Sequence, residues 1–352
     1  MEDKRISIYD IAEKTGYSAV TVHRALNNKG RISKKTKELI LETARQIGYK
    51  ANPAAQGLRR APIKIGAVLF CQVEEYVDGI IHGIAAGGRE LEEYNVSTDI
   101  RKIEYTDDLQ CINTTCEIVK EFADKHYNGM ILFASTGVDK LGALCDLLKE
   151  ISGKGIPFAT VASDIPMDER VIYVGINAFM AGSMAAEMLE LSCANRDVAL
   201  LVARDTSPVD KDYIDGFLDY AKKSVFSGIR IYEHFDERDK VVAATKRMLE
   251  ENPNLSGIYM ASASSVLACE CIGTEKSQEL TIVTTDLLKK TPELLKGKTA
   301  NATIFQDPFG QGKRVVRLLY NYITTKTDCG QHFILPQILL SSNVDAYLSE
   351  NC

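Results

Sequence analysis

Short apolar segments at helical spacing fill the first fifty residues of the chain. Ile8, Ile11 and Ala12 fall on one face of a short helix. Ser7 precedes this segment and Asp10 follows three residues later, a capping-box-like pair in which each side chain accepts a hydrogen bond from the other residue's backbone N–H. The pattern therefore predicts an amphipathic helix that begins after Ser7.

A second short helix is predicted after a tight turn at residues 15–18. Gly16 can adopt the positive φ that such a turn needs, and Ser18 can cap the helix that follows. Val22 and Leu26 lie four residues apart and would face inward. Two short helices joined in this way form a helix-turn-helix, a motif whose second helix enters the major groove of DNA.

The outward face of this second helix carries the candidate DNA contacts. Arg24 can donate two hydrogen bonds to a guanine edge. The small polar residues around it suit phosphate oxygens and are Ser18, Thr21 and Asn27. A third helix, capped by Ser33 and ending at Gly48, would complete a small bundle. A generic three-helix bundle with solvated polar residues is the alternative.

Residues 52–60 predict a segment that becomes helical only when a partner supplies contacts. Asn52 can cap a helix and Pro53 suits its first position, but Gly57 interrupts the segment after about two turns. Leu58 is apolar and would serve as a wedge in a minor-groove base step. A plain flexible linker is the alternative.

After Pro62 the pattern changes to apolar runs that alternate with amphipathic stretches. This alternation is typical of βαβ units and parallel sheets. The predicted strands are residues 65–70, 130–134, 158–161, 171–174, 198–202, 229–232, 258–261 and 280–284. Because these strands are too many for one small sheet, we expect two doubly wound lobes with a ligand cleft between them. On one amphipathic stretch, the four-residue spacing of Gly79, Gly83 and Gly87 favours close helix packing.

Charge divides the chain at the same boundary. Residues 1–62 hold 13 basic against 6 acidic side chains, a net charge of +7, and the remainder holds 29 against 42, a net charge of −13. A basic head on an acidic body is typical of a polyanion-binding module. Residues 1–5 lack the apolar segment of a signal peptide, and no run of about 18 apolar residues predicts a membrane span. We therefore expect a cytoplasmic protein with no membrane partner.

The chemistry-bearing residues predict neither a metal site nor an active site. The nine cysteines form no CxxC pair, and the five histidines show no metal-ligand spacing. No GxGxxG or GxxxxGK[ST] motif follows a strand, and neither GxSxG nor HExxH occurs. We expect no enzyme activity, no cofactor and no metal.

The first 60 residues resemble the LacI/GalR family of bacterial transcription regulators. The matching residues are 8–12, 16–18, 21–22, 24–27, 32–33, 48–49, 52–53 and 58–59. The resemblance implies a homodimer on a pseudo-palindromic operator, with recognition helices in successive major grooves and paired hinge helices opening the central minor groove. It implies base contacts from Ala19, Val20 and Arg24, phosphate contacts from Tyr9, Ser18, Thr21 and Asn27, and a wedge at Leu58. His23 replaces the serine usual in the family, a change that bears on operator preference or backbone contact.

The rest of the chain resembles the periplasmic-binding-protein-like, sugar-sensing core of the same family. The matches, in order, are residues 155–157, 173–177, 181–182, 215–217, 282–286 and 303–308. The resemblance implies a small polar effector, a sugar or nucleobase, between the lobes. Tyr76 would stack on its ring, and the hydrogen-bonding residues would be Ser135, Asn177, Asp286 and Gln306.

Three positions depart from the sugar-binding pattern. The chain has Ala162-Ser163, Tyr213 and Ser262-Ala263 where sugar-binding members commonly have Asp-Arg, Arg and Asn-Asp. The consequences left open are a less hydroxylated ligand, a different anchoring pattern, or a core that has lost small-molecule sensing.

Together these patterns predict an α/β protein with a small all-α helix-turn-helix DNA-binding domain (1–50), a hinge (51–62) and a two-lobed, doubly wound parallel-sheet core (63–352). The first lobe would cover about 63–165 and 305–325, and the second about 166–304 and 326–352. We expect a transcription regulator, a repressor, that binds operator DNA as a homodimer and responds to a small polar effector. The alternative is a DNA-bound regulator whose core mainly binds a partner protein.

Overall fold

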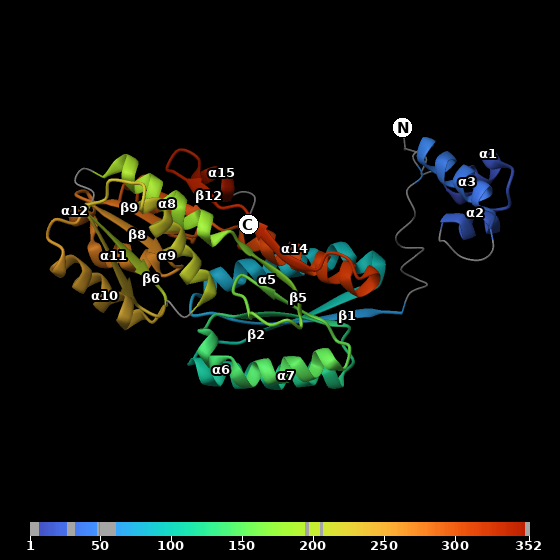
Figure 1. Cartoon of the computed structure of the whole chain (residues 1–352), viewed down its shortest axis with the longest axis horizontal. Helices are drawn as coiled ribbons and strands as arrows, with labels where there is room; N and C mark the ends of the chain where they lie inside the picture. Colours follow the sequence, from blue (N-terminus) through green and yellow to red (C-terminus); the bar gives the residue numbers. More distant parts are fainter. Residues whose placement is uncertain are drawn as a thin grey trace. The chain divides into compact units, whose positions relative to one another are not determined.

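The computed structural model describes residues 7–26, 32–47, 49, 61–193, 197–204 and 207–348. A small helical head and a larger core form separate compact units (Figure 1). The predicted residues Asn27 and Leu58, and hinge residues 51–60, lie outside the described ranges. Within those ranges, no helix is both long and apolar enough to cross a membrane.

Three helices form the head, and the predicted helix-turn-helix is confirmed. They are α1 (Ile8–Thr15), α2 (Ala19–Leu26) and α3 (Lys34–Gln46). At the start of α1 the capping box is complete, because Ser7 N–H donates to Asp10 at 2.6 Å and the Ser7 hydroxyl accepts from the backbone. Gly16 ends α1 with a φ of 71°, and the Ser18 hydroxyl accepts from the Thr21 N–H at 3.2 Å. The small core contains Ile11, Val22, Ala25, Ile40 and Ala44.

The core contains two six-stranded sheets, which confirms the two-lobed α/β architecture. The first sheet is fully parallel and has the order β11 (Gly330–Ile334), β5 (Arg170–Ile176), β4 (Phe158–Val161), β3 (Gly129–Ala134), β1 (Ile63–Phe70) and β2 (Val96–Lys102). Its central strands are buried on both faces, which explains why they are continuous apolar runs.

The second sheet repeats this plan with one antiparallel edge strand. Its order is β12 (Gln337–Leu339), β10 (Ala302–Phe305), β9 (Thr281–Thr285), β8 (Gly257–Ala261), β6 (Asp197–Val202) and β7 (Gly228–Glu233). β12 pairs antiparallel with β10, and the other strands run parallel.

Helices cover both faces of each sheet. In the first lobe they are α5 (Glu74–Leu91), α6 (Asp108–Asp124), α7 (Gly142–Gly153) and α14 (Pro308–Thr325), with short 3₁₀ turns η1 (Glu92–Tyr94) and η2 (Val138–Lys140). In the second lobe they are α8 (Ala178–Ser192), α9 (Pro208–Ala221), α10 (Arg238–Glu251), α11 (Ser265–Ile272), α12 (Thr274–Ser277), α13 (Thr291–Lys296) and α15 (Val344–Leu348). In Figure 1, α6 and α7 lie on one face of the first sheet, with α5 and α14 on the other.

The sheets divide the chain differently from the predicted lobe boundaries. β5 belongs to the first sheet although the prediction assigned residues 166–304 to the second lobe. β11 also belongs to the first sheet, whereas β12 lies in the second sheet as the prediction for residues 326–352 has it. The chain therefore crosses between lobes after β5, after β10 and after β11. The apolar run at 171–174 identifies a buried strand, but hydrophobicity alone does not indicate which sheet that strand joins.

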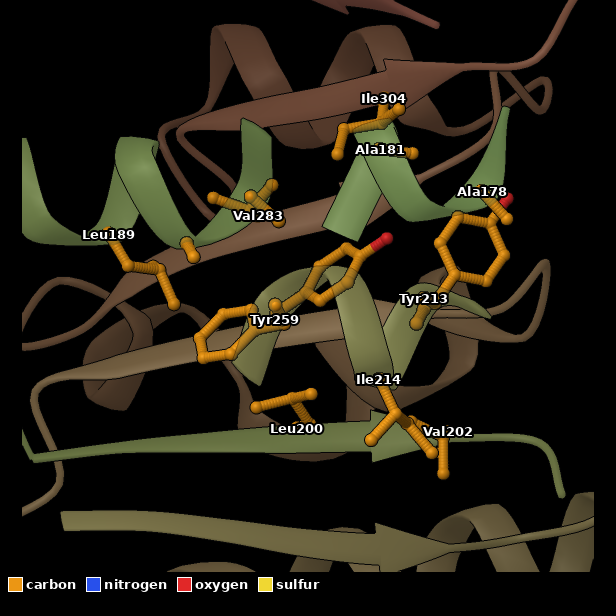
Figure 2. Packing of buried hydrophobic residues seen from close by; sticks show 14 of the residues in the cluster. Ala178, Ala181, Leu189, Leu200, Val202, Tyr213, Ile214, Tyr259, Val283 and Ile304 are labelled. Atoms are coloured by element: carbon orange, nitrogen blue, oxygen red, sulfur yellow. The ribbon is translucent and has the colours of Figure 1, made fainter. Parts of the chain in front are cut away.

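Each lobe contains one pair of helices whose backbones approach closely at glycine. A Cβ at Gly83 on α5 would meet the Phe309 carbonyl oxygen on α14, and a Cβ at Gly182 on α8 would meet the Tyr213 carbonyl oxygen on α9. The predicted packing role of the α5 glycines is therefore confirmed. Figure 2 shows Tyr213 of α9 and Tyr259 of β8 in the apolar core of the second lobe. Their ring centroids are 6.2 Å apart.

Candidate DNA interface and ligand cavity

The second helix of the head presents a mostly exposed surface. Val20 is 60% exposed, Arg24 is exposed, and Ala19 and His23 are partly exposed. Tyr9, at the start of α1, is 71% exposed. Ser18 is exposed and Thr21 is partly buried, and their hydroxyls lie 2.9 Å apart. The described DNA-binding candidates thus lie outside the head's apolar core.

The core contains a cavity of about 80 Å³ at the carboxyl ends of strands from both sheets. Doubly wound folds bind ligands at this edge because the loops after parallel strands meet there. The volume corresponds to about two or three water molecules. It is far below the roughly 300–1,000 Å³ of drug-sized ligand sites.

A larger surface depression of about 650 Å³ lies elsewhere on the first lobe. Its lining includes residues 126–128 and 154–157, which precede β3 and β4. It therefore lies at the amino ends of the strands, opposite to the edge at which doubly wound folds bind ligands.

Four of the five predicted effector contacts line the cavity. They are Tyr76, Ser135, Asp286 and Gln306. Tyr76, on α5, donates its hydroxyl hydrogen to Gln306 Oε1 at 3.4 Å, and Gln306 Nε2 donates to Asp286 Oδ1 at 2.9 Å. These three side chains join the first lobe, a crossing segment and the second lobe in one hydrogen-bonded chain.

Asn177 is not brought to the cavity. Its Oδ1 accepts a hydrogen bond from the Met180 N–H at 2.9 Å and so caps α8. Its position at the crossing after β5 explains the resemblance to the family pattern, but the structure gives the side chain a capping role.

Asp286 is held in an unusual conformation. Its φ is 77°, a region that side-chain-bearing residues adopt rarely and at a cost of about 1–3 kcal/mol. The Asp286 N–H donates to Ile304 O at 2.9 Å, and the Asp286 carbonyl accepts from Thr303 Oγ1 at 2.7 Å. These contacts fix the carboxyl group at the cavity.

Burial dominates the electrostatics of Asp286. The residue is 2% exposed, and desolvation raises the pKa of Asp286 to about 8. The Gln306 hydrogen bond lowers this pKa and the charge of Asp236 raises it. Burial therefore favours the protonated form of the Asp286 carboxyl near neutral pH.

Sequence reasoning missed three charged residues of the cavity. Arg204 follows β6, Asp236 follows β7, and Asp210 lies in the first turn of α9. The available signal was position, because charged side chains just after predicted parallel strands lie at the ligand-binding edge. The substituted positions Ala162, Ser163, Tyr213, Ser262 and Ala263 also line the cavity.

Arg204 joins the two lobes. Its Nη1 contacts Asp108 Oδ2 of the first lobe at 3.1 Å, and its Nη2 donates to the Phe235 carbonyl at 3.2 Å. The Arg204 and Asp108 side chains are 8% and 20% exposed, so solvent screens this ion pair only weakly. Glu75 of the first lobe also accepts a hydrogen bond from the Lys289 N–H of the second.

Known proteins match both units of the chain. Residues 74–327 match the family model of the periplasmic binding protein domain, and residues 7–52 match that of the bacterial regulatory proteins of the lacI family. The ribose operon repressor of Halalkalibacterium halodurans is 25% identical over 333 residues, 91% of each chain. The transcriptional regulator DegA of Bacillus subtilis is 25% identical over 213 residues, and the match spans 60% of each chain.

Solved structures share the fold of the core. A solute-binding protein of Burkholderia graminis in complex with D-arabinose has a TM-score of 0.70 at 19% identity, over 82% of this chain and 99% of that one. One from Bacillus halodurans with bound myo-inositol has a TM-score of 0.68 at 13% identity, over 83% and 99%. The two curated relatives are regulators rather than enzymes, in agreement with the absence of catalytic motifs. The chain belongs to the lacI family of bacterial regulatory proteins, with a periplasmic binding protein domain as its core.

Proposed function

We propose that this protein is a cytoplasmic transcription repressor that binds a pseudo-palindromic operator as a homodimer and responds to a small polar effector in the cavity. The observation that carries the proposal is the capped helix-turn-helix with Arg24 exposed on α2. The +7 charge of residues 1–62 supports it, because basic residues are attracted to DNA phosphates.

Contacts on DNA divide by chemistry. Arg24 would read a guanine edge, and Ala19 and Val20 would contact base edges beside it. Tyr9, Ser18 and Thr21 would bind phosphates and fix orientation, and His23 would modify this pattern. Asn27 as a phosphate contact and Leu58 as a minor-groove wedge stay predictions.

The cavity supports an effector that carries hydroxyl groups. Tyr76, Ser135, Asp286 and Gln306 supply donors and acceptors, and each hydroxyl of a polyol both donates and accepts. The names of the ribose operon repressor and of the solute-binding proteins with D-arabinose or myo-inositol support this ligand class. The effector would bind between the lobes and change operator affinity by favouring one lobe arrangement.

The substituted cavity positions favour a second candidate, a core that mainly binds a partner protein. Ala162-Ser163 and Ser262-Ala263 remove charged or amide groups from the lining. A thermal-shift screen of the full chain against sugars and cyclitols separates the candidates. Stabilisation by at least one compound supports a small-molecule effector. If no compound stabilises the protein, a core that binds a partner protein is favoured.

The test of DNA binding uses an operator selected from random duplexes, which we expect to be an inverted repeat. Arg24→Ala should weaken operator binding by about 1–3 kcal/mol and leave binding to random DNA nearly unchanged. Arg45→Ala is the control, because Arg45 is exposed in the last turn of α3, outside the proposed recognition helix. If Arg24→Ala weakens binding to operator and random DNA equally, Arg24 contacts phosphate rather than a base. If the protein selects no sequence from the random duplexes, the proposed regulator function is wrong.

A further inference from the structure

The charged side chains of the cavity are unbalanced. Among the described lining residues, the cation is Arg204 and the acids are Asp210, Asp236 and Asp286. The Arg204 guanidinium forms an ion pair with Asp108 of the first lobe. Asp108 itself does not line the cavity. Three carboxyl groups therefore line a small buried space, and burial raises the pKa values of two of them, Asp210 and Asp286.

No histidine charge compensates these acids. His234 lies beside them, with its Nδ1 accepting from the Asp236 N–H at 3.1 Å and its Nε2 3.2 Å from the Ser262 hydroxyl. Burial lowers the pKa of His234, so the imidazole is neutral near pH 7. Asp236 Oδ1 accepts a hydrogen bond from the Ser264 hydroxyl at 2.7 Å and lies 3.7 Å from His234 Nδ1.

Two polar atoms at the cavity are buried and make no hydrogen bond within the described part of the chain. They are Asp286 Oδ2 and the Tyr213 hydroxyl, on residues 2% and 3% exposed. A buried polar group without a partner costs about 1–3 kcal/mol, so such groups in a native protein commonly have a ligand. Here both belong to the same lining, at its acidic side.

Aromatic rings accompany the unpartnered carboxyl. Tyr76, Phe133 and Tyr213 line the cavity, and the Tyr76 and Phe133 rings meet edge to face at 6.1 Å. A carboxyl group among aromatic rings favours an organic cation, because ring faces attract positive charge. A neutral polyol would use the hydrogen-bonding groups but would bring no positive charge to the Asp286 carboxyl.

We propose that the effector is a polyol with a protonated amino group, an amino sugar or a related compound, and that its ammonium binds between the Asp286 carboxyl and the rings of Tyr76 and Tyr213. This inference rests on the proposed effector function. The hydroxyls bind Ser135 and Gln306, and the ammonium replaces the proton on Asp286.

Binding then releases a proton. The Asp286 carboxyl loses its proton to solvent when the ammonium supplies the compensating charge. The titratable groups around Asp286 are Asp236, Cys71, Tyr76, Tyr213 and Tyr259. Burial raises the pKa of the Cys71 thiol to about 12 and raises the pKa values of the three tyrosines, so these four stay neutral at pH 7.

Matched compounds test the charge directly on the full-length protein. Calorimetry at pH 7 compares D-glucose with D-glucosamine, D-galactose with D-galactosamine and D-mannose with D-mannosamine. The N-acetyl forms keep the substituent and remove its charge. We expect at least one amino sugar to bind about tenfold or more tightly than its neutral and N-acetyl counterparts. Its measured heat should depend on buffer ionisation enthalpy, with release of up to about one proton.

Two variants locate the effect. Asp286→Asn keeps the oxygen that accepts from Gln306 and removes the charge, so it should abolish the amino preference and the proton release. Asp239→Asn removes an exposed carboxylate of the same lobe and should preserve both.

Each outcome has a distinct meaning. Neutral sugars that bind as well as their amino counterparts would overturn this inference and leave the proposed effector function standing. An amino preference that survives Asp286→Asn would overturn the assignment of the site. Binding of no compound from either class would overturn this inference together with the polyol effector, while operator selection would still test DNA binding by itself.

Discussion

The two lobes share one architecture but contribute different chemistry to the cavity. Both contain a six-stranded sheet, helices on each face and one close helix pair. The first lobe lines the cavity with uncharged residues, namely Cys71, Tyr76, Phe133, Ser135, Thr136, Ala162 and Ser163. The lining residues that carry a guanidinium or carboxyl group, Arg204, Asp210, Asp236 and Asp286, come from the second lobe. In the proposed function, the second lobe would therefore select the charge of the ligand, and the first would supply uncharged surface.

The largest expected effect concerns the unpaired acid of the second lobe. The folded-state pKa of Asp286, about 8, lies above the ordinary value of 3.8. Its contribution to stability is therefore fully present below about pH 4 and is lost as the pH rises towards 8. Asp286→Asn should be more stable than the wild type by on the order of 4 kcal/mol near pH 7, with little difference near pH 4.

Urea unfolding between pH 4 and 9 measures this difference, with Asp239→Asn as the control. Parallel stability profiles for Asp286→Asn and the wild type would show that Asp286 is ionised in the folded cavity at neutral pH.

The next effect tests what the lobes share. Gly83→Ala in the first lobe and Gly182→Ala in the second should each destabilise the core by about 3 kcal/mol, because the added methyl group meets a backbone carbonyl. Gly142→Ala is the control, since a Cβ there meets nothing within 4 Å. Thermal unfolding measures all three. If only one of the two helix-pair variants loses much stability, the two lobes do not depend on the same close helix packing.

A smaller effect concerns the ion pair between the lobes. In a double-mutant cycle, Arg204→Met and Asp108→Asn should show a coupling energy of about 1–2 kcal/mol, because the pair is mostly buried. Solution X-ray scattering should also give Arg204→Met a larger radius of gyration. Additive single effects with unchanged scattering would mean that the pair does not hold the lobes together.

The smallest effects compare the tyrosines of the two lobes. Tyr76→Phe removes the donor to Gln306 and should destabilise the protein by about 1 kcal/mol. Tyr213→Phe removes a buried hydroxyl that makes no described hydrogen bond, so the free protein should be equally stable or about 1 kcal/mol more stable. Chemical denaturation resolves the signs. A destabilised Tyr213→Phe would mean that this hydroxyl already has a partner in the free protein.

Much of the fold was predictable because buried parallel strands are continuous apolar runs. The eight predicted strands correspond to eight of the twelve strands in the described part of the chain. Three of the four missed strands carry weaker signals: β2 reads Val-Ser-Thr-Asp-Ile-Arg-Lys at a sheet edge, β11 is largely exposed, and β12 has three residues. The fourth, β10, is buried but has only four residues. At edges, strand pairing rather than hydrophobicity determines the structure.

The candidate site was only partly predictable. Asp286 and Gln306 followed from the family resemblance, and Asn177 resembled a ligand residue although its side chain caps α8. The acidic excess depends on Arg204 pairing with Asp108, a contact between residues 96 positions apart that no local pattern encodes. The unpartnered Asp286 oxygen likewise required the three-dimensional arrangement.

Operator binding by the full-length protein tests most directly whether the cavity controls the head. Fluorescence anisotropy with a selected operator fragment would measure the dissociation constant with and without a saturating amount of the tightest-binding compound. We predict a change of about fivefold or more for the wild type and a much smaller change for Asp286→Asn at the same compound concentration. An operator dissociation constant that stays the same while the compound saturates the core would contradict the account, because the cavity would then bind a ligand without regulating DNA binding.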